Sequence, residues 1–306
     1  MTPGGSPSRH TGLRGTMTAL VTPFDGSGEV DGKALRELVR WQVDSGIDAL
    51  VPCGTTGEGA TLGPEETERV IKIVVEAAAG EVPVVAGCGS NDTRRTVDNA
   101  RRAAACGADA LLVVTPYYNK PNRSGMAAHF RAVAEATGLP ILIYNVPGRT
   151  GQNLGAEGIL RLAEIPHVAG VKEASGDLEQ VALVLAGRSV GFVVLAGDDA
   201  LAVPAIALGA DGLVSVLSNE APAETARMIG AALAGDFALA RSIHFRLLPL
   251  MRANFLESNP VPVKTALALL GRCRGDLRAP LGPPEESTRD ALQGALHEAG
   301  LLRQPR

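Results

Sequence analysis

The 306-residue sequence contains few aromatic residues and few lysines. Aromatic side chains make up 3% of the chain, and the three tyrosines are Tyr117, Tyr118 and Tyr144. The lysines are Lys33, Lys72, Lys120, Lys172 and Lys264. Because both residue types are rare, their positions single out a few segments of the chain as candidates for function.

The chain also lacks the spacing patterns of disulfide frameworks, metal sites and nucleotide sites. Its cysteines, Cys53, Cys88, Cys106 and Cys273, include no C-x-x-C pair, which in a chain of this length predicts reduced thiols. The histidines form no ligand-spaced set, and Asp198-Asp199 precedes a helical run, where aspartate usually caps the helix. The segment 87–92 begins like a dinucleotide fingerprint but has Asp92 in place of the third glycine. We therefore expect no metal ion and no bound dinucleotide.

Charge and hydropathy exclude further classes of protein. The net charge is −4 and no cluster of five or more basic residues occurs, which argues against a nucleic-acid partner. No apolar run reaches the length of a membrane span, and the N-terminal residues lack the apolar core of a signal peptide. These absences predict small-molecule partners, no contact with nucleic acid or membrane, and a cytoplasmic location.

The hydrophobic pattern predicts an α/β fold. From Met17 onward, short apolar runs alternate with amphipathic stretches of the kind that form βα units around a parallel sheet. The candidate strands are 17–22, 48–53, 83–87, 109–114, 140–144, 168–172, 192–196 and 211–216. The segment 46–51 recurs weakly at 107–112 and 209–214, each copy pairing a helix-ending glycine with a buried strand. Eight such units predict a closed (β/α)₈ (TIM) barrel.

The predicted barrel occupies residues 15–235. Residues 1–14 are rich in Gly, Ser, Pro and Thr and are expected to form a disordered tail. After about residue 235 the strand signals stop, and 236–306 contains helical patterns interrupted by prolines at 260, 262 and 280. We expect this segment to form a C-terminal helical domain.

The active site of such a barrel is built at the C-terminal ends of its strands, and all three tyrosines fall there. Lys172 ends one apolar strand and could form a Schiff base with a carbonyl, or could instead pair with Glu173 or Asp177. Tyr144 ends the preceding strand and could transfer protons beside Lys172, or could be an ordinary core tyrosine.

Two loops are candidates for binding anions. Gly54-Thr55-Thr56-Gly57-Glu58 follows a strand, so its backbone amides could cradle a small carboxylate, although a simple tight turn has the same composition. Arg149 lies in a loop bounded by proline and glycine, where its guanidinium could bind a carboxylate or could simply be solvated.

Four motifs together resemble the dihydrodipicolinate synthase family of pyruvate-dependent class I aldolases. They are Gly54-Thr55-Thr56-Gly57-Glu58, the segment 144–151 (Tyr-Asn-Val-Pro-Gly-Arg-Thr-Gly), the segment 170–174 (Gly-Val-Lys-Glu-Ala) and the segment 259–264 (Asn-Pro-Val-Pro-Val-Lys). The resemblance covers residues 13–302 in register. It implies a barrel with a helical C-terminal domain and a homotetramer built from two tight dimers.

The resemblance also implies a reaction and a role for each site residue. Lys172 would form the Schiff base with pyruvate, so that no separate cofactor is needed, and Tyr144 would exchange protons through Thr55 with Tyr118 of a neighbouring subunit. The pyruvate carboxylate would bind Thr55 and Thr56, while Gly197 and Val214 would line the pocket. Arg149 would bind the carboxylate of L-aspartate 4-semialdehyde. The product would be 4-hydroxy-tetrahydrodipicolinate, in the first committed step of the diaminopimelate and lysine pathway.

Other functions compatible with the barrel remain open. Sialic-acid lyases and keto-deoxy-sugar aldolases share the lysine and the tyrosine, but typically have Gly-Ser-Thr-Gly-Glu and lack the arginine, so Thr55 and Arg149 favour the synthase. A non-catalytic 2-oxo-acid-binding barrel would have no use for the set of Lys172, Tyr144, Thr55 and Tyr118.

One departure from the family pattern concerns regulation. Members that lysine inhibits carry polar or histidine residues and a glutamate in a cleft at the dimer interface, where this chain has Pro64, Thr67 and Arg95. Asn91 and Tyr117 are retained. Because Arg95 would repel a lysine ligand, we expect weak or absent feedback inhibition by lysine.

Overall fold

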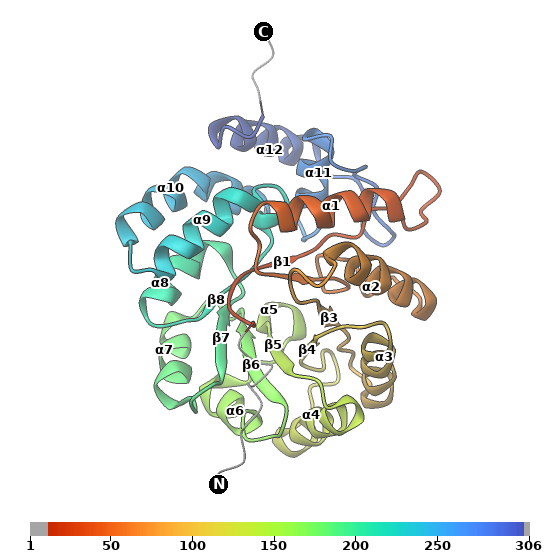
Figure 1. The fold of residues 1–306 in the computed structure, drawn as a ribbon, viewed down its shortest axis with the longest axis vertical. Coiled ribbons are helices and arrows are strands. Elements are labelled where there is room, and N and C mark those ends of the chain that lie inside the picture. The colour runs from red at the N-terminus through yellow and green to blue at the C-terminus, as the bar shows by residue number, and fades with distance from the viewer. Residues whose placement is uncertain (1–11, 303–306) are drawn as a thin grey trace.

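The computed structural model describes residues 12–302, which form a parallel barrel surrounded by helices (Figure 1). The strands are β1 Gly15–Ala19, β2 Ala49–Val51, β3 Val85–Gly87, β4 Ala110–Val114, β5 Ile141–Asn145, β6 Val168–Glu173, β7 Val193–Ala196 and β8 Gly212–Ser215. The α-helices are α1 Gly32–Asp44, α2 Pro64–Ala78, α3 Thr93–Ala105, α4 Arg123–Thr137, α5 Pro147–Thr150, α6 Gly155–Leu162, α7 Leu178–Gly187, α8 Ala202–Ala207, α9 Pro222–Leu233, α10 Phe237–Ala253, α11 Val261–Leu269 and α12 Glu286–Glu298. Two 3₁₀ turns, η1 Asp199–Leu201 and η2 Leu217–Asn219, flank β8.

The strands close into a barrel, as the sequence predicts. Seven parallel pairings give the order β2-β1-β8-β7-β6-β5-β4-β3. The remaining seam, between β2 and β3, is closed by a parallel bridge between Leu50 and Val84 and by a hydrogen bond from the Gly87 amide to the Pro52 carbonyl at 2.9 Å. The predicted (β/α)₈ barrel is therefore confirmed.

Each predicted strand overlaps an observed one, and β1 shows the largest offset. The sequence predicts 17–22, whereas β1 ends at Ala19. Beyond it, the side chain of Asn219 takes over the hydrogen bonding, because its Oδ1 accepts from the Val21 amide at 3.1 Å and its Nδ2 donates to the Ala19 carbonyl at 2.8 Å. Leu20 and Val21 lie beyond the end of β1 but are still buried, which explains why the apolar run in the sequence is longer than the strand.

Side chains alternate between the barrel lumen and the surrounding helices. On β5, Leu142 and Tyr144 belong to the lumen cluster, whereas Ile141 and Ile143 belong to the larger cluster beneath the helices. The same alternation places Val214 in the lumen and Leu213 outside it. This pleat decides which residues at the strand ends can face the mouth of the barrel.

The helices α10, α11 and α12 follow the last barrel helix, α9, and gather at one end of the molecule beside α1 and α9 (Figure 1). Pro260 immediately precedes α11, and Pro262 lies in its first turn, where a proline is tolerated. The division at residue 235 into a barrel domain and a helical domain stays a prediction. Of the predicted tail, residues 1–11 lie outside the described residues, while Leu13 is buried.

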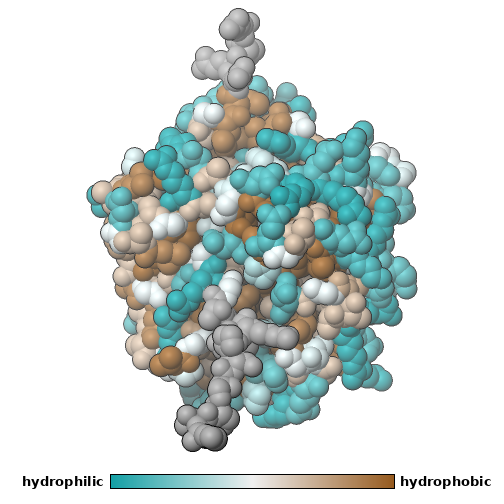
Figure 2. Space-filling model, viewed as in Figure 1, coloured by the Kyte–Doolittle hydropathy of each residue, from teal (hydrophilic) through white to brown (hydrophobic). Residues whose placement is uncertain are grey.

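The hydropathy of the outer surface differs from one side of the molecule to another. Hydrophilic residues predominate over the side of the molecule that carries α1, α2 and α3 (Figure 2). Ion pairs link neighbouring helices there, such as Arg36 to Glu76 at 2.8 Å and Arg102 to Glu68 at 2.6 Å. Between residues 12 and 302 no helix is both long enough and apolar enough to cross a membrane.

A carboxyl group is buried next to η2 with an incomplete set of partners. Glu220 is 1% exposed, and its Oε1 accepts a hydrogen bond from Asn254 Nδ2 at 2.6 Å, while Oε2 has no partner among the described residues. Burial raises the pKa of Glu220 well above its usual range. The folded protein therefore releases the Glu220 proton at a higher pH than the unfolded chain does.

We predict that Glu220→Gln stabilises the protein more at high pH than at low pH. An unfolded glutamate loses its proton at about pH 4 to 5, whereas the folded Glu220 keeps its proton to a higher pH. The wild type therefore loses stability as the pH rises above about 5 towards the raised pKa. The gain is about 1.4 kcal/mol for each unit by which the pKa is raised. Urea unfolding at pH 5 and pH 8.5 measures it, with the exposed Glu286→Gln as control. A difference that does not change with pH contradicts the prediction.

Candidate active site

Lys172 and Tyr144 lie side by side inside the barrel. The parallel register of β5 and β6 pairs the two residues directly. Lys172 Nζ lies 4.3 Å from the centre of the Tyr144 ring, and the residues are 5% and 7% exposed. The predicted approach of these two side chains is therefore confirmed.

The alternative interpretation of Lys172, an ion pair with Glu173 or Asp177, is wrong. Glu173 is held elsewhere, because its Oε1 accepts from the Ser175 amide at 2.7 Å and its Oε2 from Asn145 Nδ2 at 2.9 Å. Asp177 instead caps α7 and accepts from the Glu179 amide at 2.9 Å. No ion pair joins Lys172 to a carboxylate within residues 12–302, so its amine has no competing anionic partner.

The loop after β2 is unusually compact. Cys53 and Glu58 adopt left-handed backbone conformations, with φ of 57° and 52°. A Cβ atom on Gly59 would lie 2.2 Å from the Cys53 carbonyl oxygen, so only glycine fits there. Within this loop Thr55 lines a cavity, whereas Thr56 is 2% exposed and accepts a hydrogen bond from Asn259 Nδ2 at 2.9 Å.

A buried ion pair between Lys264 and Glu58 holds the same loop in place. Lys264 Nζ lies 2.7 Å from Glu58 Oε1 and 2.9 Å from the Thr22 carbonyl oxygen, and both charged side chains are almost fully buried. Glu58 Oε2 accepts from the Arg278 amide at 3.0 Å. Burial lowers the pKa of Lys264, and the charge of Glu58 opposes that shift. Sequence reasoning assigned no role to this pair, although the scarcity of lysine was a usable signal.

Arg149 belongs to the short helix α5 and is exposed at the barrel mouth. Its Nη2 donates a hydrogen bond to the Asn259 carbonyl oxygen at 3.3 Å, and it forms no ion pair within the described residues. Its guanidinium is therefore held at one edge and retains donors for an incoming carboxylate.

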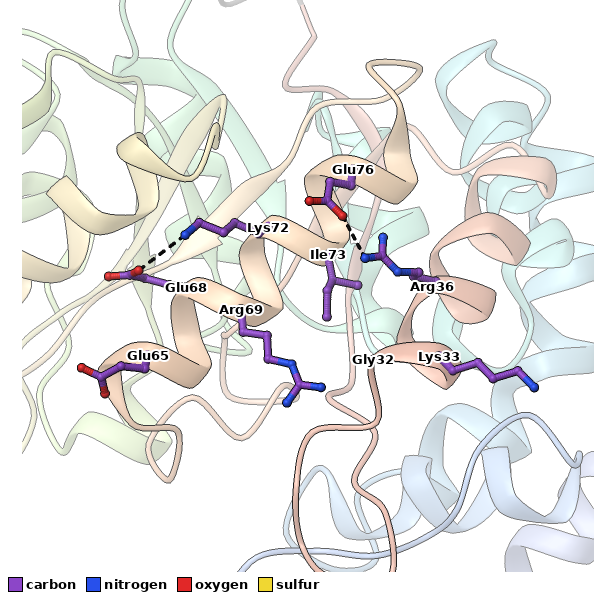
Figure 3. A pocket seen from close by; sticks show the side chains of 9 residues that line it. All are labelled: Gly32, Lys33, Arg36, Glu65, Glu68, Arg69, Lys72, Ile73 and Glu76. Carbon is purple, nitrogen blue, oxygen red and sulfur yellow. Dashed lines mark hydrogen bonds and ion pairs between the residues drawn. The ribbon is translucent and has the colours of Figure 1, made fainter.

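A cavity of about 740 Å³ connects several of these residues. Its lining includes Thr55, Tyr144, Arg149 and Asn259, and it extends past Pro64, Thr67, Arg95 and Tyr117. Small anionic substrates could enter here and reach the Tyr144 side of the lumen. A second hollow of about 560 Å³ lies on the outside between α1 and α2 (Figure 3). It is lined mainly by charged side chains, several of which are paired with one another, as Arg36 is with Glu76.

Of the three remaining predicted site residues, two lie in or beside the lumen and one is exposed on the surface. Gly197 follows β7, and a Cβ atom there would lie 2.5 Å from the Cβ of Ala174. Val214 is 1% exposed in the lumen. Tyr118 is 90% exposed and does not line the cavity, so a single chain does not bring it to Lys172, Tyr144 and Thr55.

Among residues 12–302, no group of three or more His, Cys, Asp or Glu side chains is placed to share a metal ion. Asp198 is the N-cap of η1 and accepts from the Ala200 amide at 2.9 Å. Asp199 is buried and accepts from the Val216 amide at 3.0 Å. The two aspartates therefore have structural partners in the protein.

The fold and the site define a (β/α)₈-barrel enzyme with a lysine at the carboxyl end of β6 that has no ion-pair partner between residues 12 and 302. The model of the dihydrodipicolinate synthetase family matches residues 12–299, and the chain belongs to this family. It is 51% identical over 292 residues to the 4-hydroxy-tetrahydrodipicolinate synthase of Koribacter versatilis, covering 95% of this chain and 97% of the relative.

Two solved structures extend the comparison. The dihydrodipicolinate synthase of Cyanidioschyzon merolae, solved with lysine bound, superposes with a TM-score of 0.92 at 42% identity and covers 95% of this chain and 99% of its own. A monomeric dihydrodipicolinate synthase variant superposes with a TM-score of 0.93 at 40% identity, covering 96% and 99%. Structures of this family thus include one with lysine bound and one that is monomeric.

We predict that lysine inhibits this protein weakly or not at all. The cavity wall carries Arg95, whose positive charge opposes a cationic ligand, together with Pro64 and Thr67. The measurement is the initial rate with lysine titrated into the millimolar range. A rate that falls by half in this range contradicts the prediction. Arg95→Glu should make the protein more sensitive to lysine, because the variant replaces a repelling charge with an attracting one.

Proposed function

We propose that the chain catalyses the 4-hydroxy-tetrahydrodipicolinate synthase reaction, which condenses pyruvate with L-aspartate 4-semialdehyde. The observation that carries the proposal is the buried amine of Lys172, which has no carboxylate partner in the described part of the chain and lies beside Tyr144 in a barrel of this family. The reaction is the first committed step of the diaminopimelate route to lysine.

The chemistry follows from an amine facing a 2-oxo acid. The neutral amine of Lys172 adds to the ketone carbon of pyruvate, and loss of water gives an imine. Removal of a proton from the pyruvate methyl group gives an enamine, whose carbon attacks the aldehyde. The amino group of the aldehyde substrate then attacks the imine carbon, closes the ring and releases Lys172. One water leaves overall.

Residues around the Lys172 amine carry out the proton transfers in these steps. The phenol of Tyr144, adjacent to Lys172, serves the carbinolamine and imine steps and passes protons through the hydroxyl of Thr55. The hydroxyls of Thr55 and Thr56 hold the pyruvate carboxylate. Gly197 and Val214 shape the lumen around the imine, since a side chain at 197 would collide with Ala174.

Arg149 determines the choice of aldehyde. Its guanidinium lines the cavity with no carboxylate partner in the described part of the chain, so it suits a short aldehyde that carries a carboxylate. A sugar-derived 2-oxo acid, the substrate of the lyase alternative, presents hydroxyl groups there and gains less from a cation.

The oligomer belongs to the same proposal. Tyr118 is 90% exposed on one chain, with φ of 70° in a loop after β4, and a second subunit would receive its side chain. We propose a tight dimer in which each Tyr118 completes its neighbour's proton relay, two such dimers forming a tetramer. A cytoplasmic location accords with a biosynthetic enzyme acting on these metabolites.

Lys172→Ala is predicted to abolish both turnover and covalent trapping. The measurements are pyruvate consumption with L-aspartate 4-semialdehyde and the mass gained on borohydride treatment with pyruvate. Wild-type protein should turn over and gain mass, because only an imine is reduced to a stable adduct. Trapping without turnover in the wild type points to a sugar-derived aldehyde, and absence of trapping overturns the Schiff-base mechanism in favour of a binding protein.

Mixed oligomers test the position of Tyr118. We predict that Lys172→Ala and Tyr118→Phe are each nearly inactive alone. A heterodimer purified with two different tags should regain about half the wild-type activity, because one of its two sites then has an intact Lys172 and an intact Tyr118 from the other chain. Heterodimers no more active than the parents would place Tyr118 within its own subunit's site.

A further inference from the structure

Asn259 contacts two proposed substrate-binding residues at once. It immediately precedes the cis-bonded Pro260 and α11, is 7% exposed and lines the cavity. Its side-chain Nδ2 donates to Thr56 Oγ1 at 2.9 Å, and its backbone carbonyl accepts from Arg149 Nη2 at 3.3 Å. A single residue between α10 and α11 therefore joins the loop after β2 to the short helix α5 that follows β5.

The side-chain hydrogen bond fixes the role of the Thr56 hydroxyl. A threonine hydroxyl has one proton to donate and two lone pairs to accept with. Because Asn259 Nδ2 donates to this oxygen, the Thr56 proton is not used on Asn259 and remains available to another acceptor. A carboxylate, which only accepts hydrogen bonds, is the ligand that this arrangement suits.

The remaining atom of the Asn259 amide argues against a purely structural role. Its Oδ1 is buried and has no hydrogen-bond partner among the described residues. Of the buried side-chain atoms left without a partner there, it is the one whose residue lines the cavity. An unsatisfied buried oxygen destabilises a fold, so stability alone does not account for an asparagine at this position.

We propose that Asn259 is a positioning residue that directs the Thr56 hydroxyl proton towards the carboxylate of pyruvate. The inference rests on the proposed function, in which pyruvate forms the imine with Lys172. The side chain of Asn259 orients Thr56 and so affects the binding of pyruvate. Its backbone carbonyl holds Arg149, which binds the aldehyde.

Asn259→Leu tests the proposal, because leucine has a similar volume and no polar atoms. The readout is the pyruvate concentration that gives half-maximal borohydride trapping, which needs no aldehyde. It should rise about tenfold, the effect of losing one well-placed hydrogen bond. The KM for the aldehyde should change less, since the backbone carbonyl that holds Arg149 is still present. The melting temperature should stay the same or rise.

Two further variants connect the effect to Thr56. Asn259→Asp keeps the size of the side chain but replaces the donor with an acceptor, so the Thr56 proton turns away from pyruvate and the half-saturating concentration should rise at least as much. Thr56→Val removes the hydroxyl. In the double variant Thr56→Val with Asn259→Leu, trapping should match Thr56→Val alone.

Asn254→Leu is a matched control. Asn254 is a fully buried amide after α10 whose Oδ1 also lacks a partner among the described residues, but its Nδ2 donates to Glu220, away from the cavity. This variant should leave half-saturation by pyruvate unchanged. The proposal is overturned if Asn259→Leu behaves like the control, if its effect adds to that of Thr56→Val, or if it lowers the melting temperature without altering half-saturation. Failure of the wild type to be trapped at all would instead overturn the proposed function.

Discussion

The parallel pairing of β5 with β6 places Tyr144 opposite Lys172, and the arrangement of the site depends on that register. Because neighbouring side chains on a strand point to opposite faces, Lys172 enters the lumen only if Glu173 leaves it. A shift of one residue would exchange them and put a carboxylate where the amine is needed. The hydrogen bonds of Glu173 to Asn145 and Gln180 outside the lumen hold β6 in the functional register.

The C-terminal helices stabilise the mouth of the barrel through two contacts from one short segment. Lys264 forms a buried ion pair with Glu58, and Asn259 reaches Thr56 in the same loop. A buried ion pair adds little net stability, yet removing one partner costs about 3–5 kcal/mol because a charge is left uncompensated. The pair therefore specifies where the loop sits, and the helices become part of the site that the barrel strands define.

Local patterns were sufficient to predict the barrel but not the connections across it. Eight apolar runs and the strand-end positions of Lys172 and Tyr144 follow from alternation along short segments. The contact of Thr56 with Asn259 joins residues 203 positions apart, and the hydrophobic periodicity of short segments cannot predict a contact between such distant residues. Likewise, the sequence could not show that the Glu173 carboxylate accepts hydrogen bonds from Asn145 and Gln180. These bonds keep Glu173 from forming an ion pair with Lys172. The position of Tyr118 relative to a second subunit is not defined by one chain.

The charge inside the cavity differs in sign from that of the whole chain. The protein carries a net charge of −4, yet Glu58 is the one carboxylate among the cavity's lining residues, and its two oxygens are bound by Lys264 and the Arg278 amide. Arg149 and Arg95 line the same cavity without carboxylate partners in residues 12–302. The charged side chains that line the cavity therefore carry a net positive charge, and the low-dielectric walls of a cleft strengthen the attraction of such charges for anions. Because pyruvate and an aldehyde with a carboxylate are both drawn to such a field, it is this local balance, rather than the net charge, that suits the site to two anionic substrates.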